Sequence, residues 1–123
     1  MSHELPYEGL RVLEFSQGYA APYCAMMLAQ YGAEVIKLEP PRGDWVRGVG
    51  KPAGDHTALS IIANIGKKNF ALDLKSAAGQ ALAKRLADES DVVVEAGRPG
   101  VAARLGLDYA AVRADNPGVI YVS

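Results

Sequence analysis

The feature that most constrains the fold of this chain is a regular alternation of short apolar runs with helix-forming segments. The clearest apolar run is residues 91–95, whose three consecutive valines suit a strand that is covered on both faces. Such strands are typical of parallel sheets, in which helices connect one strand to the next. The alternation therefore predicts an α/β fold, a Rossmann-like parallel sheet with flanking helices.

The expected elements follow one another closely except in one place. Strands are expected at residues 11–15, 34–38, 69–73, 91–95 and 119–122, and helices at residues 23–31, 57–64, 77–89, 101–105 and 108–115. Residues 40–54 are rich in Pro and Gly and are expected to form a long loop, a kind of segment that usually serves a function. In the 77–89 helix, Ser76 is the expected N-cap, and Ala78, Leu82, Leu86 and nearby alanines are expected to share the packed face.

Composition argues against several classes of partner. The chain has 13 basic and 14 acidic residues and a net charge of -1, so no global field attracts nucleic acid or an anionic membrane, and neither is expected as a partner. The single cysteine, Cys24, cannot form a disulfide within the chain and is expected to be an inert core thiol. Without a signal segment or an apolar run of membrane length, a cytoplasmic protein is the simplest interpretation.

Familiar motifs for other chemistries do not occur in the sequence. Residues 16–22 lack the Gly-x-Gly-x-x-Gly and Gly-Lys-Ser/Thr patterns, which disfavours an ordinary NAD or ATP site. No histidine set has metal-ligand spacing, so no metal is expected, and His3 and His56 are expected at the surface. The sequence favours Trp45 as a lid on the core over a ligand clamp, and Lys67 as part of a solvated turn.

Candidate site residues follow the strands at their carboxyl ends, where ligands of Rossmann-like folds bind. The loops concerned are residues 16–22, 39–47, 73–76 and 96–104. They carry four cations that suit a phosphate-bearing nucleotide, namely Arg42, Lys75, Arg98 and Arg104. Lys75 lies near a helix start, where a bound anion would compensate the unfavourable helix dipole. Arg104 is open to a second interpretation, as a surface arginine with a buried stem.

An ordered series of motifs extends over nearly the whole chain. The motifs are Gly9-Leu-Arg-Val-Leu-Glu-Phe15, Ala21-Pro22, Gly32-Ala-Glu-Val-Ile-Lys-Leu-Glu39, Gly43-Asp44, Leu72-Asp73-Leu-Lys75, Val93-Val-Glu95 and Arg98-Pro-Gly100. In this order they resemble the class III coenzyme A transferases, the CaiB/BaiF family, which also includes alpha-methylacyl-CoA racemases. The likeness runs from Leu5 to Ser123.

The resemblance implies which residues hold coenzyme A. Gly18, Tyr19 and Ala20 would line the path of the pantetheine and the nucleotide. The residues that would flank the adenine and the phosphates are Leu72, Asp73, Leu74, Lys75, Ala96, Gly97, Arg98, Arg104 and Leu105.

This chain departs from formyl-CoA transferase, one family member, at three places. Ala96 and Gly97 replace an Asn-Phe pair and remove an aromatic wall. Pro40 stands where that relative has a phosphate-binding arginine, so the role is either absent or taken over by Arg42. Tyr19 replaces a glutamine, which puts that polar contact in doubt.

The resemblance also implies a reaction. In the family, an aspartate attacks the acyl-CoA thioester to give a mixed anhydride, and the released CoA thiolate then forms an aspartyl-CoA thioester. That aspartate is expected beyond Ser123. Residues 1–123 are therefore expected to be the N-terminal CoA-binding segment, an incomplete part of the family's large domain, without activity of its own. Acyl-CoA and a carboxylic acid are the expected substrates, and the full-length protein is expected to be a homodimer.

Two alternatives remain open at the level of sequence. A racemase would abstract a proton beside the thioester carbonyl with a downstream acid/base pair, and the same segment would serve it equally well. The chain could also be a non-catalytic module that binds CoA.

Overall fold

A five-stranded parallel sheet forms the centre of the computed structural model, which describes residues 5–123. Its strands, in spatial order, are β5 (Lys68–Ala71), β2 (Glu34–Glu39), β1 (Arg11–Glu14), β6 (Val92–Val94) and β7 (Ile120–Val122). In chain order this is third, second, first, fourth, fifth, which is the Rossmann arrangement. The predicted α/β fold with a parallel sheet is confirmed. The strand order reverses between β1 and β6, the place where such folds bind ligands.

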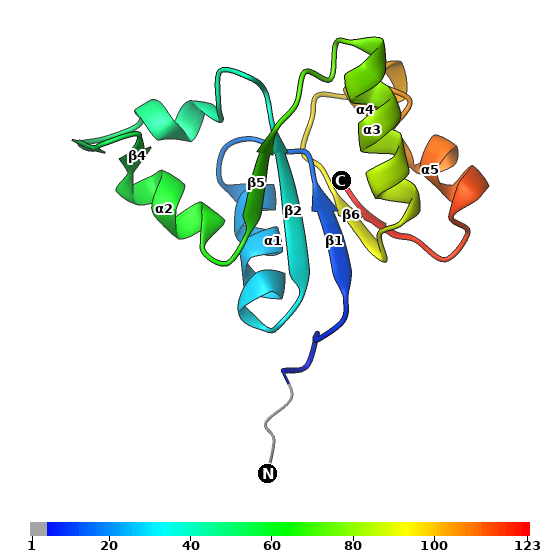
Figure 1. Ribbon diagram of the computed structural model, residues 1–123, viewed down its shortest axis with the longest axis horizontal. Coiled ribbons are helices and arrows are strands. Elements are labelled where there is room, and N and C mark those ends of the chain that lie inside the picture. Colours follow the sequence, from blue (N-terminus) through cyan, green and yellow to red (C-terminus); the bar gives the residue numbers. More distant parts are fainter. Residues whose placement is uncertain (1–4) are drawn as a thin grey trace.

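Helices lie on both sides of the sheet (Figure 1). On one side are α1 (Ala20–Gln30) and α2 (Ala58–Asn64), and on the other are α3 (Ala77–Asp88), α4 (Val101–Arg104) and α5 (Tyr109–Asp115). Successive strand residues point to opposite faces, so each strand contributes to two cores. In β1, Val12 packs in the α1 core with Ala21 and Ala25, whereas Leu13 packs in the opposite core with Ala83 and Val112.

Helix α3 packs on the sheet through its smallest residues. Gly79, Ala83 and Ala87 are buried and Leu86 packs against the same core, so the expected packed face is confirmed there, whereas Ala78 is exposed and Leu82 only half-buried. Small residues bring a helix axis closer to the sheet than leucines would allow. The predicted N-cap is confirmed, because the Ser76 hydroxyl accepts a hydrogen bond of 3.0 Å from the Gly79 N–H.

The segment expected as one long loop contains short regular elements. A 3-10 helix, η1 (Trp45–Gly48), precedes an antiparallel pair of two-residue strands, β3 (Pro52–Ala53) and β4 (His56–Thr57). Thr57 then caps α2 through a reciprocal pair of bonds with Ser60. Alternating hydrophobicity cannot reveal strands of two residues, which explains why they were not predicted.

Other expectations concern single side chains. Cys24 is half-buried in a groove on the outer side of α1, so it is not a core thiol as predicted. His56 is exposed as expected and lies 3.1 Å from a guanidinium nitrogen of Arg47, while His3 lies outside the described residues. Among the helices of residues 5–123, none is long and apolar enough to cross a membrane.

Candidate functional site

The loops that follow β1, β2, β5 and β6 meet at the carboxyl edge of the sheet and enclose a pocket of about 520 Å³. Residues of all four loops or their flanks line it, namely Phe15, Gln17, Leu38, Pro40, Pro41, Arg42, Leu72, Asp73, Leu74, Lys75, Val101 and Leu105. A second hollow of similar volume adjoins it and shares Phe15, Arg42 and Leu105. It adds the residues Ser16, Trp45, Glu95, Ala96, Gly97 and Arg98. The structure thus brings together most of the residues singled out from the sequence.

The walls of the pocket are mainly apolar. Phe15, Leu72 and Leu105 are only partly buried and pack against the core beneath α3. Backbone bonds place two of these walls, because the Leu72 N–H donates to the Glu39 carbonyl and the Phe15 N–H donates to the Val94 carbonyl. In both strands the hydrogen-bonding pattern of the sheet therefore continues for one residue past the strand, and that residue places an apolar side chain in the pocket.

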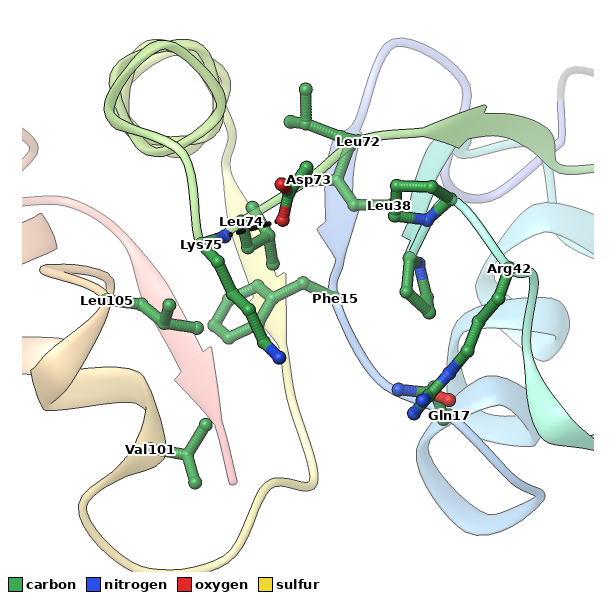
Figure 2. A pocket seen from close by; sticks show the side chains of 12 residues that line it. Phe15, Gln17, Leu38, Arg42, Leu72, Asp73, Leu74, Lys75, Val101 and Leu105 are labelled. Carbon is green, nitrogen blue, oxygen red and sulfur yellow. Dashed lines mark hydrogen bonds between the residues drawn. The ribbon is translucent and has the colours of Figure 1, made fainter.

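Cations surround these walls. Lys75 on one side and Arg42 on the other extend toward the space between them (Figure 2). Arg98 belongs to the adjoining hollow. Within residues 5–123, none of these three takes part in an ion pair, and all three are exposed. Cations that converge without carboxylate partners can bind an anion.

The turn that carries Lys75 is tightly packed against α3. The Asp73 carboxylate accepts a 2.9 Å bond from the Lys75 N–H, and the Asp73 carbonyl accepts a bond from the Ser76 hydroxyl. Gly79 of α3 presses on this turn so closely that a Cβ atom there would collide with the Asp73 carbonyl oxygen. The pocket wall at residues 72–75 is therefore held rigidly by the start of α3.

Four of the predicted site residues do not line either hollow. Gly18 is buried beneath the Trp45 ring, where a Cβ would lie 3.0 Å from a ring carbon, and its φ of +92° favours glycine. Tyr19 stacks on Tyr23 with ring centroids 5.3 Å apart, and Ala20 faces a groove outside α1. Arg104 lies in the last turn of α4, where its guanidinium approaches Gly100.

Sequence reasoning missed several residues at the site. Phe15 and Leu38 line the pocket at the ends of β1 and β2, and Gln17 and Val101 line it from within the loops 16–22 and 96–104, although none of the four was named as a candidate. Position relative to the strand ends was the signal that could have found them. Trp45 was predicted as a lid on the core, but 60% of its surface is exposed and its ring covers Gly18 instead.

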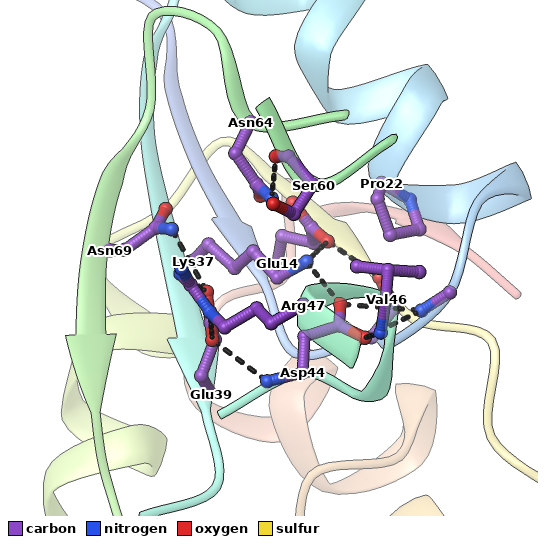
Figure 3. A network of polar contacts seen from close by, with 12 residues as sticks. Glu14, Pro22, Lys37, Glu39, Asp44, Val46, Arg47, Ser60, Asn64 and Asn69 are labelled. Atoms are coloured by element: carbon purple, nitrogen blue, oxygen red, sulfur yellow. Dashed lines mark hydrogen bonds and ion pairs between the residues drawn. The ribbon is translucent and has the colours of Figure 1, made fainter. Parts of the chain in front are cut away.

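Behind the pocket, four charged side chains form a network with no exposed surface (Figure 3). Lys37 Nζ lies 2.7 Å from an Asp44 oxygen and 3.4 Å from a Glu14 oxygen. Lys67 Nζ donates to the other Glu14 oxygen and to the Pro22 carbonyl, both at 2.6 Å. Burial lowers the pKa of Lys67, although Glu14 opposes this effect. The prediction of a solvated turn at Lys67 is therefore wrong.

A second cluster ties the same region to the sheet. One Glu39 oxygen accepts bonds from the Asp44 N–H at 2.9 Å and from Arg47 Nε at 2.8 Å, and the other accepts from Arg47 and Asn69. Burial opposes charge on Glu39, but the bonds from Arg47 and the Asp44 N–H outweigh it, so the pKa of this carboxyl lies below its usual range. The loop after β2 is thus anchored at two charged points.

Comparison with known proteins agrees with this architecture. Residues 7–123 match the model of CoA-transferase family III. The chain belongs to that family. Over 120 residues it is 41% identical to succinyl-CoA–D-citramalate CoA-transferase of Chloroflexus aurantiacus, which covers 95% of this chain and 30% of that protein. It is 40% identical over 126 residues to succinate–glutarate CoA-transferase of Agrobacterium fabrum, covering 96% of this chain and 32% of that protein.

Solved structures of the family have the same fold. A CaiB/BaiF family protein from Brucella suis superposes with a TM-score of 0.87 at 35% identity, over 97% of this chain and 33% of that one. The chain thus spans about a third of the length of these relatives, and 13% of the CoA-transferase/lyase DddD of Marinomonas, to which it is 40% identical.

Two of the positions at which this CoA-transferase family III chain differs from formyl-CoA transferase can be located in the structure. Pro40 lines the pocket beside Arg42, whose guanidinium is therefore available where the proline supplies no charge. Ala96 and Gly97 line the adjoining hollow, whose aromatic lining residues are Phe15 and Trp45. In residues 5–123, no cluster of three or more His, Cys, Asp or Glu side chains could hold a metal ion.

Proposed function

We propose that this chain supplies the part of a class III CoA transferase that binds the coenzyme A nucleotide. The enzyme would move coenzyme A between an acyl-CoA thioester and a carboxylic acid. The observation that carries this proposal is the convergence of Arg42, Lys75 and Arg98, from three different loops, around an apolar pocket at the strand-order reversal. A CoA nucleotide presents an aromatic ring beside several phosphates, and this site offers apolar walls beside several cations.

In this proposal the residues hold and orient the substrate rather than react with it. Leu72, Leu74 and Leu105 would receive the adenine, and the cations would bind the phosphates through charge-assisted hydrogen bonds. Gly18, Tyr19 and Ala20 would lie along the pantetheine as it leaves the pocket, a path that Trp45 borders at Gly18. The nucleophilic aspartate implied by the resemblance is proposed to lie beyond Ser123, which makes the 123-residue chain inactive alone.

The names of three relatives reported above favour a transferase over a racemase, because each contains CoA-transferase. The homodimer and the cytoplasmic location stay predictions for the full-length protein. Static light scattering of that protein would test the first, and fractionation of its host would test the second.

Calorimetric titration of the chain with coenzyme A tests the proposal. We expect binding, and competition by the nucleotide part of coenzyme A but not by pantetheine. Lys75→Ala and Arg98→Ala should each weaken binding by about 10- to 150-fold, since a lost bond between charged groups costs roughly 1.5 to 3 kcal/mol. Arg104→Ala, at the rim, should have a smaller effect.

The matched control is Lys68→Ala. It removes an exposed lysine of the edge strand β5 that pairs with Glu34 of the neighbouring strand β2. Its affinity for coenzyme A should equal that of the unaltered chain. Unchanged affinity in both Lys75→Ala and Arg98→Ala, or equal competition by pantetheine, would contradict the proposal.

A further inference from the structure

One buried carboxylate joins two of the loops that build the site. The Asp44 side chain accepts bonds from the Gly18 N–H at 3.1 and 3.3 Å, from the Val46 N–H at 3.2 Å and from Lys37 Nζ at 2.7 Å. Asp44 is only 2% exposed. Within the described residues, no other hydrogen bond connects residues 16–19 to residues 40–50. The relative position of the two loops therefore depends on this side chain.

The loop after β1 is held from behind as well. Glu14 accepts a 2.7 Å bond from the Ser16 hydroxyl at the start of the loop. Lys67, which is paired with Glu14, donates to the Pro22 carbonyl in the first turn of α1, just past the loop. Glu14 and Lys67 thus secure the two ends of the loop, while Asp44 holds its middle at Gly18.

The parts that Asp44 joins are parts of the pocket wall. Arg42 precedes it by two residues and reaches into both hollows, and Trp45 follows it directly and covers Gly18. The Trp45 ring is mostly exposed, and Gly18 lies against it. A shift of Asp44 would move a cation and an aromatic ring at once, although Asp44 itself lines neither hollow.

We propose that Asp44, neutralised by Lys37, is a positioning residue for coenzyme A: it places Trp45 and Arg42 against the Gly18 loop. This inference rests on the proposed function. It goes beyond that function because it assigns a binding role to a residue that the substrate does not touch. A purely structural role would instead predict that any equal loss of stability affects binding equally.

The test compares Asp44→Asn with Val112→Ala. The first change keeps the size of the side chain but removes the charge that faces Lys37, and the second removes buried volume from the core on the opposite face of the sheet. Coenzyme A affinity is measured by calorimetry. The environment of Trp45, the single tryptophan of the chain, is measured by acrylamide quenching of its fluorescence and by its indole N–H resonance. Far-UV circular dichroism confirms that each variant is folded.

We expect Asp44→Asn to weaken coenzyme A binding by about tenfold, to increase the quenching and to shift the indole resonance. Val112→Ala should change none of the three readouts. If Asp44→Asn bound coenzyme A as tightly as the unaltered chain, or if Val112→Ala weakened binding as much, the proposal would be overturned.

Two further outcomes are covered. If Asp44→Asn does not fold, Glu39→Gln decides, because it loosens the same loop at the Asp44 N–H and at Arg47. A weaker but parallel change in affinity and quenching is expected, and no change would overturn the proposal. If the unaltered chain does not bind coenzyme A, the proposed function fails. The Trp45 readouts then still decide whether Asp44 holds the loops together.

Discussion

The two faces of the sheet carry different kinds of side chains. On the face toward α3 and α5, Leu13, Leu38 and Val93 pack against apolar side chains. On the face toward α1, the strands begin with apolar residues such as Val12 and Val35. Toward the carboxyl edge the same face carries charged residues, namely Glu14, Lys37 and Glu39, all of them buried.

Apolar and charged side chains contribute to the structure in different ways. Apolar burial is strong and non-directional, so it holds a layer together without specifying where a loop lies. A buried carboxylate or ammonium is costly unless each of its partners is in place, so it specifies position. The charged residues occur only at the end of the face that borders the pocket, where the loop after β2 has to be placed. The core on the α3 face carries the apolar walls of the pocket, and the charged end of the α1 face positions the loop after β2.

The largest effect should come from breaking the charged face. Lys37→Met leaves Asp44 and Glu14 buried without their shared cation, and should lower the free energy of unfolding by about 3 to 5 kcal/mol. Urea unfolding measures the change. Lys68→Ala, at an exposed ion pair, should leave the urea midpoint unchanged. A loss equally small in Lys37→Met would remove the distinction between the two faces.

A smaller effect is expected from the apolar face. Leu107→Ala removes a fully buried side chain from the core beneath α3 and should cost about 3 kcal/mol through lost burial and the cavity left behind. Because this core does not place the loop after β2, acrylamide quenching of Trp45 in the folded variant should match the unaltered chain. Increased quenching would show that the α3 face also positions the loop.

Acid should weaken the charged face selectively, and this is the smallest of the three effects. The pKa of Glu39 is below its usual range in the folded chain, so the unfolded chain binds the proton more readily. The contribution of Glu39 to stability is therefore complete above the unfolded pKa of 4.5 and is lost as the pH falls through the folded value. Glu39→Gln should flatten this part of the stability profile, measured by urea unfolding at several pH values. An identical profile in both chains would argue against the anchor.

The sequence predicted the layers of the fold better than the details of the site. Valine-rich strands and helices with one packed face follow from local periodicity, and all five predicted strands lie close to their expected positions. The loops that meet at the pocket follow from one rule, that parallel strands end at the same edge. Local pattern does not give the rotation of a helix packed through small residues, as Gly79 and Ala83 show.

The part of the charged network at Glu14 and Lys67 could not be predicted, because these partners are distant in the sequence. Lys67 follows a glycine and precedes another lysine, a setting typical of an exposed turn, yet its partner Glu14 lies 53 residues away. From the local sequence, Glu14 and Lys37 are charged residues in strands, and such residues normally face water. Only the fold shows that they face each other beneath a loop.

The contact between Gly79 and the Asp73 carbonyl bears on the position of Lys75. Because residue 79 has no side chain, α3 lies directly against the turn that bears Lys75. Even a methyl group at position 79 would push the turn away from α3. This would displace Lys75 relative to Arg42 and change the distance between the two cations. In the proposed function, the spacing of the phosphates bound by these two cations would therefore depend on a buried residue of α3 that does not line the pocket.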